Sequence, residues 1–162
     1  MMVEMELVGV RVEMPANSPL LLLREKEGAQ RVLPIYIGHP EAMAIVSAVE
    51  GEQPPRPMTH DLLRDVVQSL AASLNKVVVT ELRDHTFYAE LELEVGTNRR
   101  RVSSRPSDAI AFAVRTGSPI FAEEAVLDEA GQLPQEPETE KAEELVDEFR
   151  HFIDQVSPED FA

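Results

Sequence analysis

The chain has 162 residues, 43% of them hydrophobic, which suits one compact domain with a sizeable core and argues against a disordered chain. Cysteine is absent, so disulfides and thiolate metal sites are excluded, and a cytoplasmic location is expected. A net charge of −15 argues against general nucleic-acid binding, and neither a membrane span nor a secretion signal is recognisable.

Three extended segments are predicted first. Residues Glu6–Met14 alternate between apolar and polar side chains, and shorter apolar runs follow at Leu20–Leu23 and Arg31–Ile37. Residues typical of turns separate these runs. Because proline cannot donate a hydrogen bond to a neighbouring strand, Pro34 predicts that the third segment lies at a sheet edge or carries a bulge.

Two helices are predicted next. Pro40 suits the first turn of a helix whose apolar residues recur at helical spacing until Gly51. After a proline-rich loop, Thr59 is the predicted cap of a second helix. The apolar stripe of that helix runs as far as Leu74, and Asn75 is expected to end it.

The second half of the chain repeats this order. Strands are predicted at Lys76–Leu82, Thr86–Val95 and Arg99–Ser104, and the middle one alternates most regularly. A helix capped by Ser107 and ended by Gly117 follows. This half ends with a short apolar piece at Pro119–Phe121. A short helix follows at Ala122–Ala130, and a glycine ends it.

An internal duplication is predicted from the overlay of the two halves. With an offset of 67 (108 minus 41), Glu41 and Ala42 coincide with Asp108 and Ala109 at the start of a helix in each half. The repeat units are residues 5–75 and 76–131, approximately. Since each unit alone would expose an apolar face, the two are expected to share one sheet. The predicted fold is α+β, with a curved, barrel-like mixed sheet and helices packed outside it.

The C-terminal region differs in composition from this domain, which spans residues 1–131. Residues 132–139 resemble a linker, and residues 140–162 are predicted to form an acidic amphipathic helix and tail. From residue 135 onward there are 10 acidic and 2 basic residues, a net of −8. The apolar face of the helix requires a partner: the body of the molecule, a second subunit or another protein. Strand edges also favour a homo-oligomer, for which a dimer is the expected state.

Three sequence blocks carry a family resemblance. They are LPIYIGHPEAMAIVSAVEG (Leu33–Gly51), RPMTHDL (Arg56–Leu62) and RPSDAIAFAVRTGSPIF (Arg105–Phe121). In this order they resemble the bifunctional nuclease domain family over roughly Met5–Gly131, and the acidic tail resembles that of actinobacterial members. The resemblance implies a duplicated α+β fold with a barrel-like sheet. It also implies a nuclease that hydrolyses phosphodiester bonds of DNA, RNA or both.

Phosphodiester hydrolysis needs an activated water and compensation for charge on the phosphoryl oxygens. In a cysteine-free protein, carboxylates holding Mg²⁺ or Mn²⁺, a histidine base and an arginine clamp commonly meet these needs. The blocks supply candidates at matching helix starts and in the loop before the second helix. The catalytic candidates are Asp108, Glu41, His60 and Asp61, and the substrate-binding candidates are Arg56 and Arg105. The metal ligands cannot be assigned, and no nucleotide or flavin cofactor is expected.

Structural explanations exist for the same residues. Carboxylates in the first turn of a helix are favoured by the helix dipole, and each arginine can pair with a neighbouring carboxylate. The run Arg99–Arg101 is expected to pair across the sheet with Glu92 and Glu94, which would leave little positive charge for phosphates. The alternative function is therefore a non-catalytic binding or regulatory module, which recruits a protein partner through its curved surface or acidic tail.

Overall fold

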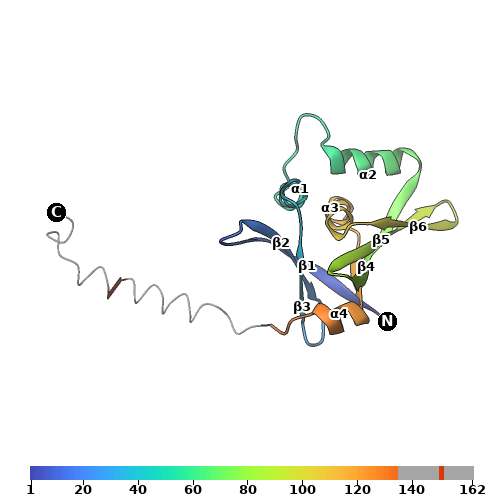
Figure 1. The fold of residues 1–162 in the computed structure, drawn as a ribbon. Coiled ribbons are helices and arrows are strands. Elements are labelled where there is room, and N and C mark those ends of the chain that lie inside the picture. The colour runs from blue at the N-terminus through green and yellow to red at the C-terminus, as the bar shows by residue number, and fades with distance from the viewer. Residues whose placement is uncertain (135–149, 152–162) are drawn as a thin grey trace, which may run out of the picture.

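The computed structural model describes residues 1–134 and 150–151 (Figure 1). The predicted linker from residue 135 onward, and the predicted tail helix apart from residues 150 and 151, lie outside the described residues. The strands are β1 (Met2–Glu13), β2 (Ser18–Glu25), β3 (Val32–Tyr36), β4 (Ala72–Arg83), β5 (Thr86–Val95), β6 (Asn98–Ser104) and β7 (Ile120–Glu123). The helices are α1 (His39–Val49), α2 (Thr59–Ser69), α3 (Pro106–Thr116) and α4 (Glu124–Ala130).

The strands form one mixed sheet in the order β3-β2-β1-β7-β4-β5-β6. The β4–β7 pair is parallel, and the neighbouring pairs are antiparallel. The mixed sheet and the helices confirm the predicted α+β class, and the sheet is curved as predicted. However, β3 and β6 remain its two edges, so it does not close into a barrel. The edge position of β3 also fits the proline within it, Pro34.

Each half of the chain contributes three antiparallel strands and then a helix. The helices that the sequence overlay aligned, α1 and α3, pack against one another, and α2 packs on α3 as well. In Figure 1 these three helices lie together on one side of the sheet, while α4 lies at the other end beside β3. This order of elements agrees with the predicted repeat. A duplication of the chain itself stays a prediction.

Helix α3 is the centre of the core. Most of its residues are buried, including Ile110 and Phe112, which are 0% and 1% exposed. Small side chains at Ala109, Ala111 and Ala113 let the sheet and the neighbouring helices approach closely on several sides. Around it pack buried side chains of the other elements: Leu21, Leu23, Leu33, Ile35, Ile45, Val77, Val79, Ala89 and Leu91. No helix among the described residues is long and apolar enough to cross a membrane.

Two predicted helix caps and one predicted helix end are wrong. The second helix begins at Thr59 with Met58 as its N-cap, and it ends at Ser69 rather than at Asn75. Ala71 adopts a φ of 57°, which turns the chain into β4, so Leu74 is a buried strand residue. The helical spacing of apolar residues continues across this turn by chance. The prediction missed the turn because no glycine or proline marks it. Likewise, the cap of α3 is Arg105 rather than Ser107, which lies inside the helix after Pro106.

Candidate functional site

The N-terminal ends of three helices meet at one polar cluster. Glu41 stands in the first turn of α1, His60 in that of α2 and Asp108 in that of α3, while Arg105 caps α3. The packing of α1 and of α2 on α3 brings these ends together. We refer to Glu41, His60, Arg105 and Asp108 as the polar cluster. These four sequence-predicted site residues therefore come together in the fold.

Arg105 joins the two carboxylates. Its Nε donates to Asp108 Oδ2 at 2.8 Å, and its Nη2 donates to Asp108 Oδ1 at 3.1 Å, so the pair is bidentate. The same Nη2 donates to Glu41 Oε1 at 2.9 Å. The Arg105 side chain is nevertheless 63% exposed. One accessible guanidinium thus neutralises carboxylates from two helices.

His60 contacts the same aspartate from α2. Its Nε2 lies 2.8 Å from Asp108 Oδ1, and its side chain is only 13% exposed. A carboxylate bound to one imidazole nitrogen fixes the orientation of the ring. The contact therefore presents the other ring nitrogen, Nδ1, in a defined direction.

Both carboxylates of the polar cluster stay ionised at neutral pH. The pKa of Glu41 lies below its ordinary value because its own backbone N–H donates to the carboxylate and Arg105 adds a second hydrogen bond. Burial raises the pKa of Asp108, but hydrogen bonds from Arg105 and His60 outweigh burial and bring it below the ordinary value. In turn, Asp108 and Glu41 raise the pKa of Arg105. The polar cluster is a network of opposite charges.

Gly38 makes room for the Glu41 carboxylate. It precedes α1 as the N-cap, and a Cβ at this position would collide with Glu41 Oε2. The absence of a side chain lets the carboxylate fold back over the start of its own helix, where backbone N–H groups favour an anion. No sequence pattern indicates this role, because a glycine before a helix is common whether or not a carboxylate folds back over it.

Asp61 lies in the first turn of α2 but bonds to a different arginine. Its Oδ1 accepts from Arg115 Nε at 2.7 Å, and its Oδ2 accepts from the Met58 backbone N–H at 3.0 Å. Arg115 is 6% exposed and also donates to the Ala111 carbonyl, so this ion pair ties the start of α2 to α3. The hydrogen bond from Arg115, more than any other interaction, lowers the pKa of Asp61. Asp61 therefore supports the helix that carries His60.

The remaining arginines are more exposed. Arg56 lies in the loop before α2 and has no ion-pair partner among the described residues. Arg99 lies 3.6 Å from Glu92, which agrees with the predicted cross-strand pairing for that arginine. Arg100 and Arg101 are exposed and form no ion pair within the described part of the chain.

A divalent cation does not fit the polar cluster as it stands. Among the described residues, no group of three or more His, Asp or Glu side chains is arranged to hold a metal ion. The guanidinium of Arg105 already bridges the two carboxylates at hydrogen-bond distance and supplies the positive charge that a cation would bring. The chemistry that this arrangement supports without rearrangement is that of a histidine, its aspartate and an arginine.

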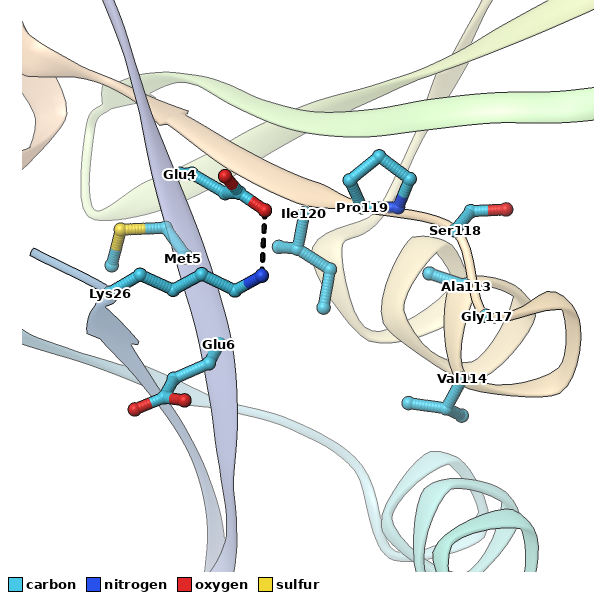
Figure 2. A pocket seen from close by; sticks show the side chains of 10 residues that line it. All are labelled: Glu4, Met5, Glu6, Lys26, Ala113, Val114, Gly117, Ser118, Pro119 and Ile120. Carbon is cyan, nitrogen blue, oxygen red and sulfur yellow. Dashed lines mark hydrogen bonds and ion pairs between the residues drawn. The ribbon is translucent and has the colours of Figure 1, made fainter.

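A cavity of about 440 Å³ lies at the opposite end of α3 (Figure 2). It is lined by Ala113 and Val114 of that helix and by Met5 of β1, and Lys26 bonds to Glu4 beside it at 2.7 Å. No residue of the polar cluster lines this cavity. The cavity is therefore distinct from the candidate site.

The fold and the site define an α+β protein with an ionised carboxylate–arginine–histidine network at converging helix starts. The bifunctional nuclease domain model matches residues 21–135, and the chain belongs to that family. The matched region contains all four residues of the polar cluster.

Known relatives fall into two groups. An uncharacterised protein of Mycobacterium tuberculosis strain H37Rv is 48% identical over 163 residues, covering 98% of this chain and 97% of that protein. The bifunctional nuclease 1 of Arabidopsis thaliana is 31% identical over 108 residues, covering 65% of this chain and 33% of the plant protein. A bifunctional nuclease of Oryza minuta is 22% identical over 145 residues, covering 88% of this chain and 44% of that protein.

Proposed function

We propose that the chain is a nuclease that hydrolyses phosphodiester bonds of DNA or RNA at the polar cluster. The observation that carries the proposal is the 2.8 Å contact between His60 Nε2 and Asp108 Oδ1 beside an exposed arginine on the same carboxylate. This combination offers a proton acceptor, a group that orients it and a cation for the phosphoryl oxygens. Membership of the bifunctional nuclease domain family supports the same function.

His60 is the proposed general base. With Nε2 held by Asp108, its Nδ1 accepts a proton from a water molecule. The water oxygen forms the new bond to phosphorus, and the ester oxygen leaves and takes a proton from solvent. Asp108 stabilises the imidazolium that results, as the carboxylate of a histidine–aspartate pair does.

Arg105 is the proposed phosphate-binding residue. A planar guanidinium binds two phosphoryl oxygens with the same geometry that it uses for a carboxylate. Because Arg105 is 63% exposed, a phosphate can reach it from solvent and replace one of its carboxylate partners. Glu41, on the other side, holds the guanidinium at the polar cluster when no substrate is bound.

Assistance by Mg²⁺ or Mn²⁺ stays a prediction. A cation bound by Glu41 and Asp108 would require Arg105 to release both carboxylates, for example when it moves to a phosphate. Hydrolysis measured with Mg²⁺, with Mn²⁺ and with EDTA separates the two possibilities. Activity that persists in EDTA supports catalysis by the side chains alone, and activity lost in EDTA supports metal assistance.

The test of the nuclease proposal uses highly purified protein with single-stranded DNA, double-stranded DNA and RNA. Removing a general base typically lowers the rate by about 10²–10⁴-fold, and we expect a loss of this order for His60→Ala. Asp108→Asn should also lower the rate, because it removes the orienting charge. His85→Asn is the matched control, since His85 is an exposed turn residue at φ 63° and Asn tolerates that conformation.

Cleavage that survives both His60→Ala and Asp108→Asn would contradict the proposal and indicate a contaminant or another site. A protein without cleavage on any substrate would favour the second function, a binding module. One observation favours that function: α2 and its C-cap expose an apolar face formed by Leu62, Val66 and Leu70, which are 46–69% exposed. An apolar face of this kind is typical of protein-binding surfaces, including those of homo-oligomers.

A further inference from the structure

We propose that one face of edge strand β6, the face that carries Arg100, Val102 and Ser104, binds single-stranded nucleic acid and leads it into the polar cluster. Arg100 is the phosphate contact farthest from the cluster. This inference rests on the proposed nuclease function and names the form of its substrate. It starts from the three consecutive arginines of β6, which differ sharply in their surroundings.

Arg100 has no carboxylate across the sheet. The β5–β6 register places it opposite Leu93, whereas Arg99 and Arg101 lie opposite Glu94 and Glu92. Arg99 forms an ion pair with Glu92, but Arg100 has no hydrogen bond or ion pair within the described residues and is exposed. Its positive charge is therefore not neutralised locally. This makes Arg100 available to a phosphate in a chain whose net charge is −15.

The face around Arg100 is apolar. Alternation along a strand puts Val102 and Ser104 on the same side as Arg100, and their register partners are Leu91 and Ala89. Val102 is 45% exposed and Val95 is 38% exposed, so apolar surface beside Arg100 is open to solvent. The glutamates of β5, in contrast, occupy the other side. One face of this strand pair thus combines a free cation with apolar area, which suits a phosphate backbone and unstacked bases.

β6 runs directly into the polar cluster. It ends at Ser104, and the next residue is Arg105. At about 3.3 Å per residue, the five steps from Arg100 to Arg105 cover roughly 17 Å. In Figure 1, β6 runs from the tip of the β5–β6 hairpin towards α3. A polynucleotide lying along this strand would contact Arg100 and Arg105 with phosphates that are a few nucleotides apart.

Single-stranded nucleic acid fits this surface better than a duplex does. The surface is a narrow strand edge. It has one free arginine, Arg100, near the hairpin, and apolar side chains lie between Arg100 and Arg105. The surface therefore offers contacts to bases as well as to phosphates. The outer face of a duplex presents only phosphates and sugars, and an acidic protein with few basic contacts binds it weakly.

The experiment measures affinity without cleavage. A fluorescent phosphorothioate DNA strand of about ten nucleotides, a length within the usual range of single-strand sites, is compared with a dinucleotide by anisotropy. Arg100→Ala should weaken binding of the longer strand about fivefold at low salt, and it should reduce the salt slope by about 0.7, as expected for one lost phosphate contact. Binding of the dinucleotide, which reaches only the polar cluster, should not change.

Arg11→Ala is the matched control. Arg11 is also exposed on a strand and has no ion pair among the described residues, but it belongs to β1, which three strands separate from β6. Equal effects of Arg100→Ala and Arg11→Ala would overturn the inference, as would a wild-type protein that binds the longer strand no better than the dinucleotide. A selective effect of Arg100→Ala would support the track even if His60→Ala left cleavage unchanged, so the two proposals can fail separately.

Discussion

At the scale of single residues, the polar cluster owes its geometry to Arg105. This side chain is the common partner of two carboxylates from different helices, while His60 shares Asp108 with it. An arginine that is bound bidentately yet exposed can exchange a carboxylate for a phosphate with little change in geometry. A lysine would not reproduce this exchange, because its ammonium group binds as a point charge.

Gly38 provides a test of the Glu41 position. In Gly38→Ala the added Cβ displaces the Glu41 carboxylate, which loses its backbone N–H donor. We therefore expect the pKa of Glu41, followed by NMR titration of the side-chain carboxyl, to rise towards its ordinary value. The free energy of unfolding should change by less than about 1 kcal/mol, because alanine readily adopts the φ of −77°. Alanine also gives the unfolded chain less conformational entropy than glycine does, which favours the folded state.

A double-mutant comparison controls for indirect effects of Gly38→Ala. In a Glu41→Ala background the displaced carboxylate is gone, so adding Gly38→Ala should change neither nucleic-acid affinity nor cleavage further. An unchanged Glu41 pKa in the single variant would contradict the role given to Gly38. So would an equal loss of affinity caused by Gly38→Ala in both backgrounds.

The gathering of the polar cluster was largely predictable from sequence. Glu41 and Asp108 stand at equivalent helix starts, and His60 and Arg105 also lie at helix starts. Asp61 has the same kind of sequence position, yet it pairs with Arg115 from the far end of α3. Which of two neighbouring residues faces a given partner depends on the rotation of α2 against α3, and that rotation is set by packing across the core.

At the scale of elements, the turn between α2 and β4 shows where sequence patterns were insufficient. The stripe that includes Leu70 and Leu74 continues at helical spacing, although Leu70 is 69% exposed and Leu74 is a buried strand residue. The break lies at Ala71, an alanine in the left-handed region where glycine or asparagine is usual. Most strands and helices were predicted correctly, because most of the turns between them carry glycine, proline or asparagine.

Substitution of Ala71 tests this explanation. A non-glycine residue in the left-handed conformation costs about 1–2 kcal/mol, and glycine loses roughly 0.5–1 kcal/mol more backbone entropy on folding. Ala71→Gly should therefore raise the free energy of unfolding by up to about 1 kcal/mol in urea denaturation. Ala72→Gly, one residue further on in β4, should lower it by a similar amount. Destabilisation by both substitutions would argue against strain at Ala71.

At the scale of the whole molecule, ion pairs form separate networks, and each network links different helices and strands. Arg31, which directly precedes β3, binds Glu25, Glu124 and Asp128, and so links β2 to α4. The Arg115–Asp61 pair links α2 to α3, and the polar cluster links α1, α2 and α3. These partly buried networks join elements from distant parts of the sequence. Although the composition is acidic overall, some arginines of these networks are largely buried. If such an arginine lost its carboxylate partner, an unpaired positive charge would remain in the interior.

The response of stability to acid follows from these networks. The pKa values of Glu25, Asp61 and Asp108 lie below their ordinary values: Arg31 dominates for Glu25, Arg115 dominates for Asp61, and for Asp108 hydrogen bonds from Arg105 and His60 outweigh burial. A carboxyl group whose folded pKa is lowered stabilises the fold above its unfolded pKa. That contribution is lost as pH falls through the folded value, because the unfolded chain binds protons first. The ordinary values are 4.5 for Glu and 3.8 for Asp.

We therefore expect the free energy of unfolding in urea to be nearly constant above about pH 5 and to fall steeply below about pH 4. Between pH 7 and the isoelectric point near 4.6, acidification also reduces the net negative charge, which weakens self-repulsion and acts in the opposite direction. Below pH 4 the lost ion pairs should dominate, since protonating Asp61 leaves the 6%-exposed Arg115 without its counter-charge. Asp61→Asn should lower stability at pH 7 and make the acid dependence shallower. Stability that is no lower at about pH 3 than at pH 7 would mean that these ion pairs do not govern the response to acid.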